Sequence, residues 1–185
     1  MWTAFMDLIS NGTPRAHRSI VQIAWVVCNL REAIKRWLDM GVGPFLTTMN
    51  RFPNAIYRGQ LVPLEFSSAL AQVGGVQIEL IEQHSPGPSA FRDVIPAGQS
   101  GFHHIWMAVP DWNHEVTSLR SRGIVLATEA EAGGVRFCYA DTHTTLGCMV
   151  ELLDDVPIVR QLLATVASTA RDWDGSDPIR PLLLT

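Results

Sequence analysis

Two short apolar runs, Gln22-Ile23-Ala24-Trp25-Val26-Val27 and His104-Ile105-Trp106-Met107-Ala108-Val109, decide how this sequence folds. Both are rich in β-branched and aromatic residues, which predicts strands. Each run leads into a helix-like stretch that ends at a glycine, Gly41 in the first half and Gly123 in the second. The run and the glycine both recur 82 positions later, at 22 and 104 and at 41 and 123. Self-similarity at a fixed spacing indicates a duplicated structural unit.

A second repeat places one glutamate in each half. Gly75-Val76-Gln77-Ile78-Glu79 and Gly147-Cys148-Met149-Val150-Glu151 lie 72 positions apart, and each reads as an apolar strand. Each half is therefore predicted to be a strand, a helix and two or three further strands, which is an α+β pattern. Residues 50–58 are predicted to form a loop. An amphipathic helix over residues 158–166 is expected to pack on the domain or on a partner subunit.

Composition restricts the class of protein. With 185 residues, 47% hydrophobic and 17% charged, the chain is typical of a globular protein. The net charge is −4 and no basic stripe is present, which argues against a nucleic-acid partner. The three cysteines form no CxxC pair, so a reducing, cytoplasmic location is expected. Residues 1–18 are interpreted as an N-terminal extension without the features of a signal peptide, and no apolar run is long enough to span a membrane.

Four polar side chains fall inside strands that are otherwise built for a dry core: Gln22, Glu79, His104 and Glu151. A lone buried carboxylate is strongly disfavoured unless it is paired or bound to a cation. Two such carboxylates at duplicated positions predict a shared divalent metal, with the amide oxygen and the imidazole nitrogen as further ligands. Zinc, nickel, cobalt and manganese all suit this set. The alternative for each residue alone is a hydrogen-bonded core side chain, or a glutamate that reaches solvent from an edge strand.

The cavity beside this site is predicted from strand alternation. Trp106 shares a strand face with His104, and Met149 shares one with Glu151, so both are expected to line the pocket. Phe102 is expected to add a further apolar pocket wall. His103, at the adjacent position, is predicted to point to the opposite face.

Residues 19–154 resemble the vicinal oxygen chelate superfamily, which includes glyoxalases, methylmalonyl-CoA epimerases and bleomycin-resistance proteins. The resemblance rests on the four motifs around residues 22–27, 75–80, 101–105 and 147–152. It implies paired βαβββ modules, about 19–84 and 101–154, that form an open cupped sheet around a metal. Residues 155–185 would then form a C-terminal helix and tail. The ligand order Gln, Glu, His, Glu is similar to that of eukaryotic-type glyoxalase I, whereas the loop 85–101 and the paired histidines resemble the epimerase branch.

The resemblance implies a metal-dependent isomerase, epimerase or lyase that transfers a proton next to a carbonyl through a metal-bound enediolate. Glu151 would be the principal base, and Glu79 would return the proton. The expected partners are a small-molecule carbonyl or CoA-type substrate and a second subunit in a homodimer. No arginine lies in the first strand, which argues against glutathione conjugates, and Gln22 replaces a histidine that an extradiol dioxygenase needs. The alternative is a non-catalytic binding protein for a hydrophobic small molecule on the same fold.

Overall fold

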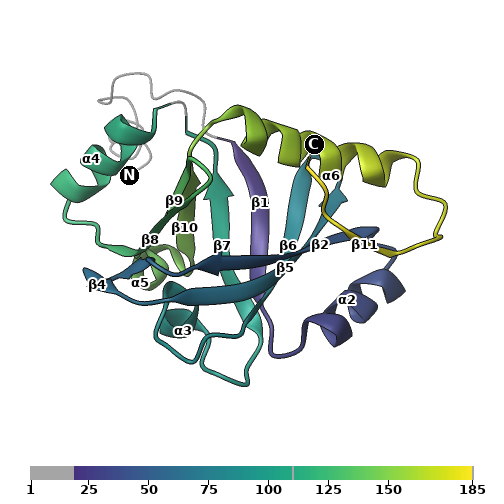
Figure 1. The fold of residues 1–185 in the computed structure, drawn as a ribbon, viewed down its shortest axis with the longest axis horizontal. Coiled ribbons are helices and arrows are strands. Elements are labelled where there is room, and N and C mark those ends of the chain that lie inside the picture. The colour runs from purple at the N-terminus through teal and green to yellow at the C-terminus, as the bar shows by residue number, and fades with distance from the viewer. Residues whose placement is uncertain (1–18, 110, 185) are drawn as a thin grey trace, which may run out of the picture.

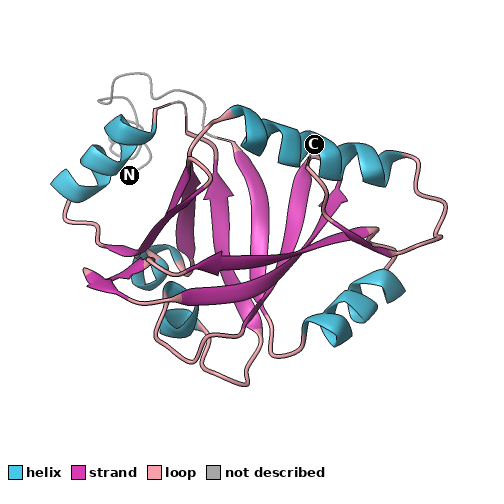
Figure 2. Ribbon diagram, viewed as in Figure 1, coloured by secondary structure: helices cyan, strands magenta, loops and turns pink. Residues whose placement is uncertain are grey.

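The computed structural model describes residues 19–109 and 111–184, which fold around one mixed sheet with helices against it (Figures 1 and 2). The strands are β1 Ile20–Val26, β2 Phe45–Phe52, β3 Ile56–Tyr57, β4 Gln60–Leu61, β5 Leu64–Val73, β6 Val76–Gln83, β7 Gly101–Met107, β8 Leu126–Ala132, β9 Val135–Ala140, β10 Met149–Leu153 and β11 Ile179–Pro181. The helices are α2 Leu30–Asp39, α3 Ala90–Val94, α4 Trp112–Ser121, α5 His143–Leu146 and α6 Pro157–Arg171.

The strand order reproduces the duplication. In the sheet, β2-β5-β6-β1 from the first half is followed by β7-β10-β9-β8 from the second. The two first strands, β1 and β7, pair antiparallel at the centre, while β1 pairs parallel with β6 and β7 parallel with β10. The sheet stays open and curves into a cup. The predicted α+β fold with an open, cupped sheet is confirmed.

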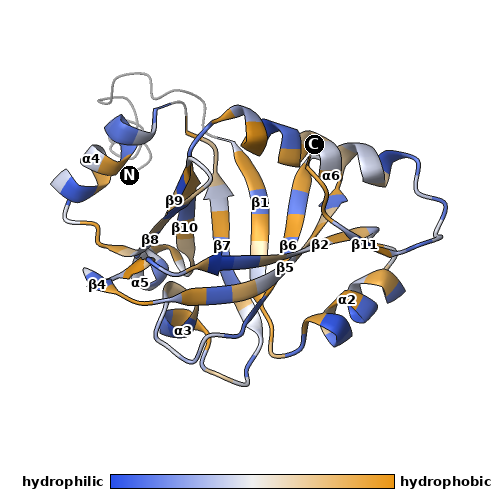
Figure 3. Ribbon diagram, in the orientation of Figure 1, coloured by the Kyte–Doolittle hydropathy of each residue, from blue (hydrophilic) through white to orange (hydrophobic). Residues whose placement is uncertain are grey.

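The repeated helices cover the outer face of the sheet. Asn29 and Asp111, again 82 positions apart, each cap a helix by accepting a backbone hydrogen bond at 3.0 Å three residues on. Helix α2 buries Leu30 and Ile34 against β5 and β6, and its other side carries charged residues (Figure 3). Such a two-sided helix is held mainly by packing of its apolar stripe. The concave face of the sheet is thereby left for a site.

Strand β2 corrects the prediction of a loop over residues 50–58. Asn50 to Phe52 belong to this strand, β3 lies within the same region, and β4 follows just beyond it. Thr48 and Asn50 face the concave side beside Phe52, whereas Arg51 faces outward. The polar inward residues remove the apolar alternation by which a strand is normally identified.

The hairpin of β3 and β4 closes one side of the cup. It comes from the first half but pairs with β8 of the second half, through Ile56 and Tyr57. Arg58 fixes this crossing because its guanidinium lies 2.8 Å from Asp93 and 2.7 Å from Asp141. The cup is consequently formed within one chain.

The C-terminal segment is part of the same sheet. β11 pairs parallel with β2, and α6 packs through Val166 against Leu46 and Leu70 (Figure 1). In the part of the chain that the structure describes, no helix is long and apolar enough to cross a membrane. The predictions for the N-terminal extension, residues 1–18, lie outside the described residues.

Candidate metal centre and cavity

Strand register brings the predicted site residues together from four strands. On the concave face, Ala24 of β1 pairs with Glu79 of β6 on one side and with His104 of β7 on the other. One step along, Trp106 of β7 pairs with Gln22 of β1 on one side and with Glu151 of β10 on the other. The two rows are related by the internal duplication, which exchanges the two halves of the site.

Two carboxylates face one imidazole at the centre of these rows. His104 Nε2 lies 3.2 Å from Glu151 Oε2 and 3.6 Å from Glu79 Oε2. One ligand atom from each of the three residues lies within 4.8 Å of the others. His104 is fully buried, and the side chains of Glu79 and Glu151 are only 12% and 9% exposed. Their arrangement is compact enough for one cation to contact all three.

A chain of hydrogen bonds fixes the tautomer of His104. His103 Nε2 lies 2.9 Å from the carbonyl oxygen of Ala90, which only accepts, so His103 carries its proton on Nε2. Burial, with the neighbouring imidazole of His104, lowers the pKa of His103 to about 3, so its Nδ1 is unprotonated. That Nδ1 accepts a hydrogen bond from His104 Nδ1 at 2.8 Å. The Nε2 atom of His104 is therefore left to face the carboxylates.

This Nε2 atom is buried and has no aligned hydrogen-bond partner among the residues that the structure describes. Burial lowers the pKa of His104, but the carboxylates of Glu151 and Glu79 outweigh burial and raise the pKa to about 9. Without metal the imidazole thus holds a proton between the two carboxylates. With that proton removed, its Nε2 lone pair points at the place where a cation would sit, which is the usual arrangement of a ligand histidine.

Tyr139 supports the carboxylate of Glu151. Its hydroxyl lowers the pKa of Glu151, and its ring lies 5.0 Å from the ring of His104. Burial and the charges of Glu151 and Glu79 raise the pKa of Tyr139 well above its usual range, so the phenol remains a donor. Burial also raises the pKa of Glu151, although the charge of His104 opposes this effect. Glu151 is therefore a buried carboxylate beside the cavity, in the position that a general base needs.

Gln22, the fourth predicted ligand, lies beside this group on β1 and lines the same cavity. Its amide Nε2 donates a weak hydrogen bond of 3.5 Å to Gln77 Oε1, which orients the side chain. An imidazole nitrogen, two carboxylate oxygens and an amide oxygen form a donor set that suits a divalent transition metal. The residues present therefore fit the implied cation, while the role of each as a ligand stays a prediction.

A cavity of about 300 Å³ opens above these side chains. Its floor is polar, with Gln22, Glu79 and Glu151, and three small polar side chains, Thr48, Asn50 and Ser68, lie on the β2–β5 side. The remaining wall is apolar, and aromatic and leucine side chains from both halves and from the C-terminal segment supply it. These include Phe52, Phe66, Phe137, Leu162, Leu182 and Leu184. Small-molecule sites have this character, with few polar groups in a mainly apolar pocket.

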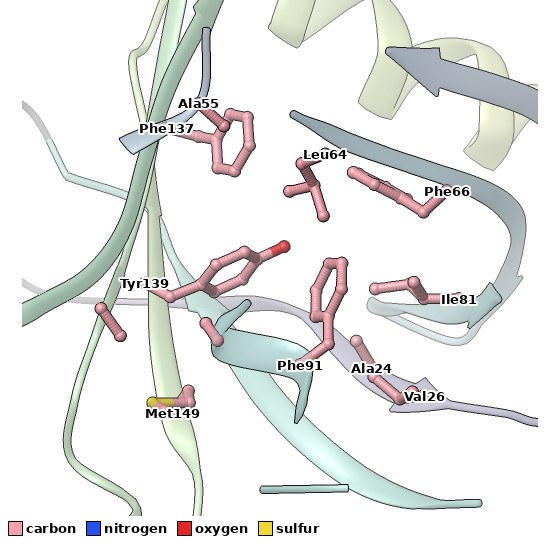
Figure 4. Packing of buried hydrophobic residues seen from close by; sticks show 12 residues of the cluster. Ala24, Val26, Ala55, Leu64, Phe66, Ile81, Phe91, Phe137, Tyr139 and Met149 are labelled. Carbon is pink, nitrogen blue, oxygen red and sulfur yellow. The ribbon is translucent and has the colours of Figure 1, made fainter. Parts of the chain in front are cut away.

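Of the three predicted pocket residues, Trp106 lines the cavity and the other two do not. Phe102 is 38% exposed and packs against Trp25 on the opposite face of the sheet, with ring centroids 5.6 Å apart. Met149 is fully buried in the core cluster below Tyr139 (Figure 4). The expectation for Phe102 is thus corrected, and Met149 supports the cavity wall from behind.

A bulge in β7 explains the error at Phe102. His104 pairs with Ala24, but Phe102 pairs with the adjacent Trp25, so His103 is an extra residue in its strand. Strict alternation is lost there, and both histidines lie on the concave side while Phe102 turns away. The prediction that His103 points to the opposite face was wrong.

Two groups of functional side chains were missed. Tyr139 carried no signal beyond an aromatic residue in a strand, although its inward parity with Phe137 could have placed it in the cavity. Leu182 and Leu184 belong to the segment interpreted as a tail, and the pairing of the preceding strand β11 with β2 brings them to the site.

Comparison with known proteins agrees with this fold. The family model described as Glyoxalase/Bleomycin resistance protein/Dioxygenase superfamily matches residues 21–139. No match was found among curated proteins. The structure is similar to that of methylmalonyl-CoA epimerase from Mycobacterium tuberculosis, with a TM-score of 0.56, 20% identity, and coverage of 80% of this chain and 97% of that chain. It is also similar to a hypothetical protein from Bacillus halodurans, with a TM-score of 0.54, 16% identity, and coverage of 76% and 96%. The chain belongs to the Glyoxalase/Bleomycin resistance protein/Dioxygenase superfamily.

Proposed function

We propose that this protein is a metal-dependent isomerase, epimerase or lyase that moves a proton on the carbon next to a carbonyl group. The observation that carries the proposal is the Nε2 atom of His104, which is buried between the carboxylates of Glu151 and Glu79 beside a small-molecule cavity. Gln22, Glu79, His104 and Glu151 would hold a divalent cation, which when bound stabilises negative charge that develops on a carbonyl oxygen.

Glu151 is the proposed base. Its carboxylate lines the cavity, and burial raises its pKa. The imidazole of His104, 3.2 Å away, holds it in place. Glu79 reaches the cavity from the opposite half, so it can deliver a proton to the other side of the substrate carbon. This symmetry suits an epimerase or isomerase, in which a proton leaves one position and returns at another.

Exchange of substrate hydrogens for deuterium tests the proposal whatever the final product is. Protein loaded with zinc, nickel, cobalt or manganese is incubated in D2O with a panel of ketones, aldehydes and CoA thioesters, and loss of the α-proton is followed by NMR. We expect exchange with the wild-type protein and at least a hundredfold slower exchange with Glu151→Gln, since general-base catalysis contributes roughly 10²–10⁴-fold.

The matched control is Glu65→Gln. Glu65 lies on β5, and its half-exposed side chain pairs with Arg51 on the outer face, 3.2 Å away. This variant should exchange as fast as wild type. Exchange that survives intact in metal-loaded Glu151→Gln would refute the assignment of the base.

The second candidate is a non-catalytic binding protein, which the mainly apolar cavity wall favours. The same experiment separates the two. A binder would retain a small ketone in equilibrium dialysis but would give no exchange above the rate of buffer alone, with any of the four metals.

A further inference from the structure

We infer that the substrate is a neutral, mainly apolar carbonyl compound whose oxygen accepts a hydrogen bond from Trp106 Nε1, and that anionic analogues are excluded. This inference rests on the proposed function, because it names the class of substrate for the same site. It is carried by the charges around the cavity, by an unpaired donor in its wall, and by the apolar C-terminal segment.

No lysine or arginine lines the cavity among the residues that the structure describes. Strand alternation accounts for this absence. Arg51 of β2 and Arg136 of β9 are on lining strands, but both occupy outward positions, where they pair with Glu65 at 3.2 Å and Asp154 at 2.7 Å. Both arginines are therefore neutralised on the far face of the sheet.

The charge balance of the site disfavours an anion further. A divalent cation on neutral His104 and Gln22 would be offset by the two carboxylates, Glu79 and Glu151, so no positive charge remains for a substrate carboxylate. Burial of an unpaired carboxylate is strongly unfavourable. Methylmalonyl thioesters carry such a free carboxylate, and this cavity offers no cationic side chain to receive it.

Trp106 carries an unpaired donor beside the cavity. Its side chain lines the cavity, is 3% exposed, and rises between Gln22 and Glu151 on the concave face. Its buried Nε1 atom has no hydrogen-bond partner in the described part of the chain. A buried donor without an acceptor is costly, and buried indole N–H groups usually find a partner. An oxygen of a bound ligand can be that partner.

The C-terminal segment makes the cavity apolar. Leu162 of α6 and Leu182 and Leu184 beyond β11 all lie in its wall. All three are outside residues 21–139, the region that matches the family model. This chain therefore adds its own apolar wall to the shared cup, as expected for a feature that sets specificity.

Three probes of similar shape test the inference: acetophenone, a neutral ketone; α-methylstyrene, which has a CH2 group in place of the oxygen; and benzoate, an anion. Binding is measured by calorimetry in excess chelator and again with zinc. In both conditions we expect acetophenone to bind at least tenfold more tightly than benzoate. It should also bind several-fold more tightly than α-methylstyrene, and Trp106→Phe should remove this second difference. Benzoate binding equal to or tighter than that of acetophenone, or no acetophenone binding at millimolar concentration, would overturn the inference.

A gain-of-binding variant keeps the test valid if Trp106→Phe does not fold. Thr48 lines the cavity from β2, so Thr48→Arg places a cation inside and should raise the affinity for benzoate at least tenfold in chelator. Met49, its neighbour, is 43% exposed on the outer face, and Met49→Arg should leave benzoate binding unchanged. If Thr48→Arg and Met49→Arg changed the affinity for benzoate equally, the assignment of position 48 to the cavity and of position 49 to the outer face would be wrong.

A parallel zinc titration separates this inference from the proposed function. If the protein prefers acetophenone over benzoate in chelator but binds no zinc, the proposed function fails and the inference about ligand charge stands. If zinc binds but benzoate is preferred in both conditions, the inference fails and the metal site stands.

Discussion

The metal-free protein should lose stability as the pH rises, because His104 holds a proton that the unfolded chain gives up. The two carboxylates raise the pKa of His104 from 6.5 to about 9 in the folded state. A raised pKa of a base stabilises the folded state fully below the unfolded pKa, near 6.5, and this contribution disappears as the pH passes through about 9. At about 1.4 kcal/mol for each pKa unit, the full effect is about 3 kcal/mol.

Urea unfolding in excess chelator between pH 6.5 and 8.5 measures this loss. We expect the free energy of unfolding to fall by about 2 to 3 kcal/mol over this range, which for a chain of this size lowers the melting temperature by about 4–12 °C. The upper limit of pH 8.5 avoids the thiols, since burial raises the pKa of Cys138 to about 12 and the unfolded thiol titrates near 9. His104→Gln should flatten the profile. Two results would refute a protonated His104 between Glu79 and Glu151, here called the charged triad. One is a free energy of unfolding that falls equally with pH in wild type and His104→Gln, and the other is a free energy of unfolding that rises with pH.

Further predictions concern the partners of the site and its wall. His103 Nδ1 accepts a hydrogen bond from His104 Nδ1, which orients the His104 ring, so His103→Leu should weaken zinc affinity about 10–100-fold. His84→Leu, at the surface, should leave zinc affinity unchanged. Equal zinc affinities of the two variants would contradict this orientation of His104. Zinc binding at pH 7 should release protons from the triad, which calorimetry in buffers of different ionisation enthalpy detects; an enthalpy independent of buffer would oppose this. Leu182→Ala should weaken acetophenone binding about tenfold, because a partly buried leucine contributes about 1.4 kcal/mol, less than the roughly 1.5–3 kcal/mol of a fully buried one, while Leu183→Ala, at a position 72% exposed, should have no effect in the same assay.

The duplication made the fold and the centre of the site predictable. Once Gln22 and His104 are placed on paired first strands, the register carries Glu79 and Glu151 to the same concave face. Periodicity was sufficient there because each polar residue interrupts an otherwise apolar strand.

The remaining features depend on information that alternation does not contain. One extra residue, His103, reverses the face of Phe102, and a bulge of this kind leaves no clear mark in the sequence. Strand β2 was missed because Thr48 and Asn50 face the cavity, so its inward side is polar. The wall contributed by Leu182 depends on pairing with a strand more than 130 positions away in the chain, which local patterns do not show.

Metal stoichiometry, measured with single-residue variants, tests the central claim most directly. Purified protein is stripped with chelator, titrated with cobalt and followed by its visible spectrum and by elemental analysis. We predict one ion per chain for wild type and for Glu65→Gln. Glu79→Gln, His104→Gln and Glu151→Gln should each bind cobalt more weakly and fill the site only at higher cobalt concentration. Failure to bind cobalt, zinc, nickel or manganese, or binding that all three substitutions leave intact, would contradict the metal centre.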